Sequence, residues 1–112
     1  MKDKSNHSQI VTPISELDMV IHEPARLMIL ALLYVVESAD FVFLMKQSGL
    51  TWGNLSSHMS KLEERGYIQI TKTFKGKRPR TILSLTGSGR TAFMEYHQRI
   101  KKVMDGISEI KK

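Results

Sequence analysis

The sequence predicts an α+β domain in which a cluster of helices is followed by a two-stranded β-hairpin and one long helix. Three observations predict it. Apolar residues recur at helical spacing through the first half of the chain, and β-branched and aromatic residues gather between residues 67 and 85. From Phe93 onwards an apolar residue returns every three or four positions. A chain of 112 residues without cysteine has room for one core and excludes disulfides and thiolate metal sites.

The N-terminal half begins with residues 1–12, which are largely polar and are expected to form a flexible tail. A short helix over residues 15–22 is expected next. Its apolar residues at helical spacing are Ile14, Leu17, Val20 and Ile21. A second helix, residues 24–37, opens with Pro24 in its first turn, where the missing N–H costs nothing. Because this helix is apolar on nearly all sides, we expect it at the centre of the core.

Two further helices are expected to form a helix-turn-helix. Asp40 is placed to cap a helix over residues 41–47. The segment Ser48-Gly49-Leu50 then makes a tight turn, in which Gly49 takes the left-handed conformation. Thr51 caps the next helix, which ends at Gly66. Two helices joined by a short glycine turn form the motif whose second helix enters the major groove of DNA.

A hairpin is expected where the apolar period changes. Two strands, about 67–74 and 80–85, flank a loop over residues 75–79, since glycine and proline there favour a loop over a continued ladder. The hairpin carries five cations and no acid between its first and last cation: Lys72, Lys75, Lys77, Arg78 and Arg80. Cations that neutralise phosphates release counterions, so we expect salt-dependent binding to DNA. Arg78 or Lys77 at the tip could enter the minor groove, while the other cations follow the phosphate backbone. A merely solubilising loop is the alternative.

The helix over residues 51–66 has a core side formed by Leu55, Met59 and Leu62. Its opposite side is small and largely uncharged, which suits close approach to base edges. The residues of this helix expected to contact DNA are Thr51, Trp52, Gly53, Asn54, Ser57, His58 and Lys61. Asn54 and Ser57 have the groups that read bases, whereas Lys61 is expected to reach a phosphate. An ordinary solvated face is the alternative.

The last helix is expected to start at Thr86 or Ser88 and to run towards Ile110. Its apolar residues follow the spacing of a heptad seam: Phe93, Tyr96, Ile100, Val103, Ile107 and Ile110. The seam predicts that residues 87–112 form a dimerisation helix, while residues 13–86 form the DNA-binding domain. It is short for a coiled coil, so packing of the helix against its own domain remains the alternative.

Charge is distributed unevenly along the chain. Residues 1–70 carry six Lys/Arg and eight Asp/Glu, whereas residues 71–112 carry eleven and three. A basic second half favours a polyanionic partner. The longest apolar run, residues 27–36, is too short to cross a bilayer. A cytoplasmic, nucleoid-associated protein with no membrane contact is therefore expected.

Four strings carry a family resemblance: L-T-x-G-N-L-S-x-H from Leu50, L-E-x-x-G-Y from Leu62, F-x-G-x-x-P-x-T from Phe74 and L-T-x-x-G-R from Leu85. Together they resemble winged helix-turn-helix transcriptional regulators, in the small single-domain group related to the MarR and ArsR types. The resemblance covers residues 15–104. It implies a dimeric prokaryotic regulator with a three-helix core, a two-stranded wing and an additional C-terminal helix. Trp52 departs from the family, which usually has a small or polar residue there, and Met59 stands where leucine is common.

Neither an enzyme nor a metal site is expected. The four histidines, His7, His22, His58 and His97, are scattered without carboxylates at ligand spacing, and no phosphate-binding loop occurs. No cofactor is expected, and the sequence indicates no effector. The expected function is sequence-specific regulation of transcription by a homodimer bound to double-stranded DNA. The alternatives are a protein-interaction adaptor and a nonspecific architectural DNA-binding protein.

Overall fold

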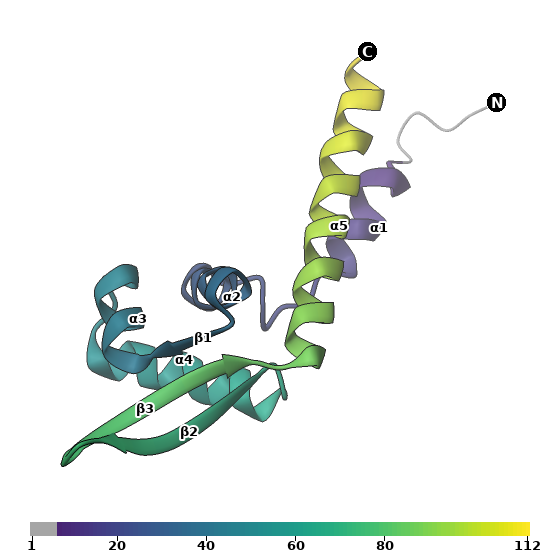
Figure 1. The fold of residues 1–112 in the computed structure, drawn as a ribbon. Coiled ribbons are helices and arrows are strands. Elements are labelled where there is room, and N and C mark those ends of the chain that lie inside the picture. The colour runs from purple at the N-terminus through teal and green to yellow at the C-terminus, as the bar shows by residue number, and fades with distance from the viewer. Residues whose placement is uncertain (1–6) are drawn as a thin grey trace.

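A computed structural model describes residues 7–112 and contains five helices and three strands within them (Figure 1). The helices are α1 (Ser8–Ser15), α2 (Pro24–Val36), α3 (Phe41–Ser48), α4 (Trp52–Glu64) and α5 (Gly87–Lys111). The strands are β1 (Ser38–Asp40), β2 (Ile68–Lys75) and β3 (Arg78–Leu85). The predicted α+β winged helix fold, with a three-helix core, a hairpin wing and a C-terminal helix, is confirmed.

The core is built around α2, as its apolar sequence predicts. Ile29, Leu30 and Leu33 of this helix are fully buried. They belong to one cluster with buried residues of α3, α4 and β3, among them Leu44, Leu55, Leu62 and Leu83. Removing a side chain of this size from water contributes about 1.5–3 kcal/mol. The cluster therefore fixes α4 against the rest of the domain, and the opposite side of α4 faces solvent.

The helix-turn-helix forms through the local signals that the sequence contains. Asp40 Oδ1 accepts a 2.7 Å hydrogen bond from the Val42 N–H at the start of α3. Gly49 ends α3 with φ 71°, a left-handed conformation that glycine adopts without steric cost. Thr51 Oγ1 accepts a 3.2 Å bond from the Asn54 N–H at the start of α4. All three predicted cap positions are confirmed.

The sheet has a third strand that was not predicted. β1 pairs antiparallel with β3, so the strand order is β1-β3-β2. Its three residues, Ser38–Asp40, have low intrinsic strand preference, and their conformation follows from pairing with a distant segment. β1 ends at Asp40, which lies opposite Ile82 of β3. From Ile82 towards the turn, the hairpin therefore consists of β2 and β3 alone. This free part of the hairpin is the wing.

The wing turn is tighter than predicted. The strands extend to Lys75 and Arg78, and only Gly76 and Lys77 lie between them. Gly76 has φ 65°, as the first position of a type II′ hairpin turn requires. Pro79 lies inside β3 rather than in a loop. It faces Phe74 in a pair that exchanges no ladder hydrogen bonds, and β1 does not reach it, so its missing N–H costs nothing.

The N-terminal segment also differs from expectation. Residues 1–6 of the predicted tail lie outside the described residues, but residues 8–12 belong to α1. The helix expected over residues 15–22 is replaced by turns from residue 16 onwards. Asp18 Oδ1 accepts the N–H groups of Val20 at 2.9 Å and Ile21 at 3.4 Å. An aspartate that binds the backbone in this way competes with helix formation.

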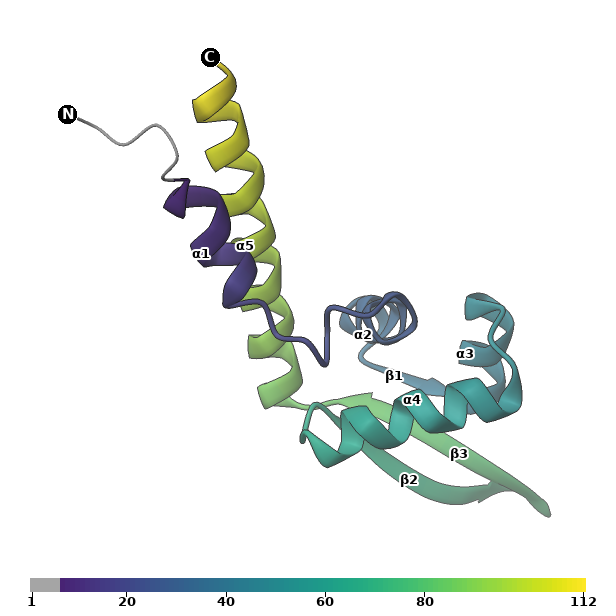
Figure 2. The ribbon, with the colours of Figure 1, turned by 180° about the vertical axis from the view of Figure 1, so that it is seen from behind.

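α5 projects from the domain as an arm, and α1 lies along it (Figures 1 and 2). The radius of gyration is 17.7 Å, whereas a compact chain of this length has about 13 Å. α1 comes so close to α5 that a Cβ atom at Gly106 would lie 2.7 Å from the Gln9 carbonyl oxygen. Within residues 7–112, no helix combines the length and apolar character needed to cross a membrane.

Candidate nucleic-acid interface

The side of α4 that faces away from the core is exposed and, apart from Trp52, polar. Six of the seven residues predicted to contact DNA from this helix are exposed: Thr51, Trp52, Gly53, Asn54, Ser57 and Lys61. Leu55 and Leu62 on the opposite side are fully buried, which holds the helix in this rotation. The structure therefore brings these six predicted residues together on one accessible helix.

The N-terminal end of α4 is open to close approach. The first N–H groups of a helix have no partner within the helix, and here the Thr51 side chain takes the one from Asn54. A Cβ atom placed on Gly53 would meet no atom within 4 Å. At Gly53 this end therefore offers backbone N–H groups without a side chain in the way, which is the arrangement that accepts a phosphate or the wall of a groove.

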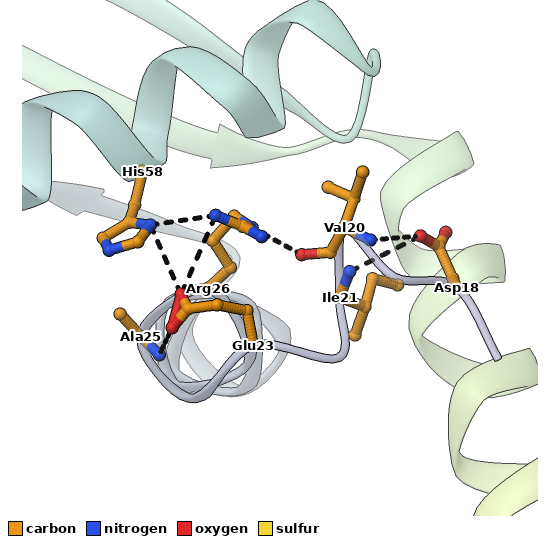
Figure 3. A network of polar contacts seen from close by, with 7 residues as sticks. All are labelled: Asp18, Val20, Ile21, Glu23, Ala25, Arg26 and His58. Atoms are coloured by element: carbon orange, nitrogen blue, oxygen red, sulfur yellow. Dashed lines mark hydrogen bonds and ion pairs between the residues drawn. The ribbon is translucent and has the colours of Figure 1, made fainter. Parts of the chain in front are cut away.

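His58 is the exception among the predicted helix residues, because its side chain turns towards α2 (Figure 3). Its Nδ1 lies 3.1 Å from Arg26 Nη1 and 3.4 Å from Glu23 Oε2. Only 23% of the side chain is exposed. The helical spacing places His58 on a flank of α4, and the N-terminal end of α2 occupies that flank.

Glu23 and Arg26 connect α4 to the segment before α2 (Figure 3). Glu23 Oε1 caps α2 by accepting a 2.6 Å bond from the Ala25 N–H. Arg26 Nε donates a 2.6 Å bond to the Val20 carbonyl oxygen. Neither residue was predicted to belong to the site. A glutamate directly before Pro24 does indicate the start of a helix. Its contact with His58 joins segments that are far apart in the sequence, so no local sequence pattern predicts it.

The pKa of the Glu23 carboxyl is lowered from its ordinary value of 4.5. Burial raises this pKa, but the hydrogen bond from Ala25 and the charges of His58 and Arg26 together outweigh burial. Glu23 Oε2 is buried and has ion-pair contacts without a hydrogen bond among the described residues. The carboxylate is therefore held charged beneath the middle of α4.

The wing presents most of its cations to solvent. Lys72, Lys75, Lys77 and Arg78 are exposed. Arg80 differs, because its Nε donates a 2.8 Å hydrogen bond to Asp40 Oδ2. This bond holds the pKa of Asp40 below its ordinary value; burial opposes the shift and the Val42 N–H supports it. Arg80 thus has a carboxylate partner, whereas the structure leaves the other four predicted cations accessible.

A groove of about 430 Å³ lies between the wing and α3. Its lining includes Val42, Phe43 and Lys46 of α3 together with Lys75, Arg78 and Arg80 of the wing. Lys46 is a further cation beside the wing that was not predicted. Lys46 lies in the last turn of α3, where the helix dipole favours a cation. This local role explains the residue without the hairpin, so the sequence does not indicate that Lys46 lies next to the wing.

The predicted seam of α5 is largely used within the chain. Tyr96 and Val103 are buried, and the Tyr96 hydroxyl lies 2.8 Å from His22 Nδ1. Phe93 and Ile100 are partly buried against the core. Ile107 and Ile110 remain 38% and 39% exposed. Contacts within the chain, the alternative considered for this helix, therefore account for four of its six apolar seam residues, three of them packed in or against the core cluster.

Other apolar side chains of the arm are exposed, namely Val11 and Ile14 of α1 and Met104 of α5. Within the part of the chain that the structure describes, no cluster of three or more histidine and carboxylate side chains is placed to hold a metal ion. The arm therefore presents a partly apolar surface. α4 and the wing present polar and cationic side chains, together with the exposed Trp52 and Phe74.

The fold agrees with the relatives of this chain. The family model described as a winged helix DNA-binding domain matches residues 25–104. An uncharacterized protein of Methanocaldococcus jannaschii is 38% identical over 88 residues, which cover 79% of this chain and 96% of that protein.

Solved structures show the same likeness. The transcriptional regulator homologue from Pyrococcus horikoshii OT3 has a TM-score of 0.79 and 29% identity, covering 89% of this chain and 97% of that one. NadR, solved in complex with 4-hydroxyphenylacetate, has a TM-score of 0.66 and 20% identity, covering 100% and 86%, and shares the fold. The chain therefore belongs to the winged helix DNA-binding domain family, among the transcriptional regulators.

Proposed function

We propose that this protein is a sequence-specific regulator of transcription that binds double-stranded DNA as a homodimer. One observation carries the proposal: α4 exposes a small polar face beside a wing with four exposed cations. The helix is suited to base edges in the major groove, and the wing is suited to phosphates. A protein with this function would be associated with the nucleoid.

The residues take different roles in this proposal. Asn54 can pair with the N6 and N7 groups of adenine, and Ser57 can donate to or accept from several bases. Lys61 and the wing residues Lys72, Lys75, Lys77 and Arg78 bind phosphates. Thr51 and Gly53 let the end of α4 approach the DNA closely. His58 and Arg80 position α4 and the wing through their partners in the domain.

The arm supports the dimer. α1 and α5 project from the domain, and together they expose Val11, Ile14, Met104, Ile107 and Ile110. A second copy of the arm would remove this apolar surface from water. A two-fold dimer would place one α4 in each half-site, with half-site centres about 34 Å apart. Such a protein would select a nearly palindromic sequence.

Binding is tested first with the full chain and random duplex DNA in low salt, by fluorescence anisotropy, and then by site selection from a random library. We expect binding in low salt and an enriched palindrome. The salt slope is the slope of the logarithm of the binding constant against the logarithm of the salt concentration. The double substitution K75A/R78A removes two phosphate contacts and should reduce this slope by roughly 0.9 for each. The double substitution K111A/K112A removes the same charge from the far end of α5 and should leave the slope unchanged.

The other outcomes identify the competing functions. A protein that binds no duplex in low salt is an adaptor rather than a regulator. A protein that binds but enriches no sequence is a nonspecific architectural protein. The dimer is tested separately by sedimentation at micromolar concentration. Ile107→Glu should shift the protein to monomer, whereas Ser108→Glu, an exposed neighbour on the same helix, should not.

A further inference from the structure

Trp52 is the single tryptophan of the chain and the first residue of α4, and it is 66% exposed. A tryptophan side chain usually buries a large apolar area. Here most of the indole is exposed to water, at the end of the helix that contains Asn54 and Ser57, the residues proposed to contact bases. Its exposure is therefore informative about what this end of the helix binds.

The indole is not a loose side chain. Its ring centroid lies 4.5 Å from that of Phe41, with 58° between the two ring planes. Phe41 is only 4% exposed and belongs to the core cluster, so it provides a fixed support. One side of the indole is held by the domain while the remainder is open. A side chain held in this way loses little conformational freedom when it binds.

The surroundings of Trp52 restrict the occupant. Gly53, the next residue, leaves open space, so a bulky partner can approach the indole closely. In the proposed function the occupant of this end of α4 is duplex DNA, so an exposed indole here needs an apolar group on the DNA to contact. Duplex DNA has one such group in its major groove, the 5-methyl of thymine.

We propose that Trp52 is a specificity-determining residue that recognises thymine by packing its indole against the 5-methyl group. This inference rests on the proposed DNA binding and adds to it a group, the thymine methyl, that the polar residues of α4 cannot read by hydrogen bonding. The indole has a single N–H donor and no acceptor, so it cannot form the bidentate pairs by which polar side chains distinguish bases. Apolar contact is what it adds to the interface.

The test replaces thymines by deoxyuridine, one position at a time, in the sequence that the wild-type protein selects. Uracil lacks the methyl group but keeps O4 and its pairing with adenine. At one thymine position in the half-site we expect wild-type affinity to fall about fourfold, the equivalent of one buried methyl group. Trp52→Ala should bind the thymine and uracil duplexes equally well at that position, and Trp52→Leu should keep part of the difference.

Each outcome separates the possibilities. Equal wild-type affinity for thymine and uracil at every position overturns the thymine contact even when the protein binds DNA selectively. The same loss in wild type and Trp52→Ala assigns the methyl contact to another residue and also overturns the inference. Absence of selective DNA binding by the wild type is a failure of the proposed function itself. Asn54→Ala, which keeps Trp52, is the matched control and should retain the uracil effect.

Discussion

Arg80 of the wing and Asp40 at the start of α3 form a 2.8 Å hydrogen-bonded ion pair. The same carboxylate caps α3 through its other oxygen, which accepts the Val42 N–H. Asp40 also ends β1, the strand that pairs with β3. One side chain therefore sets the start of the helix-turn-helix and the direction in which the wing leaves the domain.

Removing the Asp40 carboxylate should destabilise the domain. Asp40→Ala loses the cap and the ion pair, and loss of the cap alone should lower the free energy of unfolding by about 1 kcal/mol. Asp40→Asn keeps an oxygen for Val42 and should lose less. Urea denaturation of the three proteins measures these differences. Equal stability of wild type and Asp40→Ala would show that neither contact contributes.

The stability difference between wild type and Asp40→Asn should depend on pH. The pKa of Asp40 is lowered from its ordinary value of 3.8 by the Arg80 hydrogen bond, against the effect of burial. Since the folded state favours the charged carboxylate, its contribution is complete above the ordinary pKa and is lost as the pH falls through the lowered one. The difference should therefore narrow below about pH 4. A difference that stays constant down to pH 2 would contradict this role for the carboxylate charge.

His58→Ala should act on stability rather than on phosphate binding, because the imidazole faces Glu23 and Arg26. We expect the free energy of unfolding to fall by about 1 kcal/mol, since a buried carboxylate oxygen loses its neighbour. The salt slope of DNA binding should stay unchanged. Lys61→Ala, which removes an exposed cation from the same helix, should flatten the salt slope and leave the free energy of unfolding nearly unchanged. A flattened salt slope in His58→Ala would return His58 to the DNA contacts.

The predictable parts of this structure depend on neighbours in the chain. Asp40, Gly49 and Thr51 act on backbone groups no more than four residues away, so their residue types alone indicated the caps. The burial of Leu55 and Leu62 follows from helical spacing in the same way. These residues define the orientation of α4, and for this reason the exposed face of α4 was largely predicted.

The unpredicted parts depend on distant contacts. The strand Ser38–Asp40 exists because β3 pairs with it, and α1 is placed where it packs along α5. The direction of His58 depends on Glu23, which belongs to another segment. Pro79 was expected in a loop because proline usually interrupts a ladder, and only the register shows that its position needs no N–H. Local sequence patterns do not predict these contacts, because each joins residues that are far apart in the sequence or depends on strand register.

Gly53→Ala should separate stability from DNA binding. A methyl group at this position meets nothing within 4 Å, so alanine should raise the free energy of unfolding by roughly 0.5–1 kcal/mol through its helix preference. If the backbone of α4 approaches the groove wall at this point, the same methyl group should weaken DNA binding. Gly87→Ala is the control, because it also faces open space in the first turn of a helix, α5. It should not alter DNA affinity.

Gly106→Ala tests the arm, and the sign of its effect decides the result. Alanine in the middle of an exposed helix would raise stability by about 1 kcal/mol. Here the added Cβ would lie 2.7 Å from the Gln9 carbonyl oxygen, a backbone atom that cannot rotate away. α1 must therefore move from α5, and we expect a net loss of about 1–3 kcal/mol.

The displacement should be visible in the amide hydrogen exchange of α1, which should become faster in Gly106→Ala, whereas exchange in the core helix α2 should change little. Ser108→Ala, two residues further along α5 and exposed, supplies the helix preference of alanine without the clash. A dimer built on the arm should weaken in Gly106→Ala, because Val11 and Ile14 of α1 are among the exposed apolar residues of the arm. A more stable Gly106→Ala protein with unchanged exchange in α1 would show that α1 does not pack at Gly106, and the arm as a dimerisation surface would then lose its support.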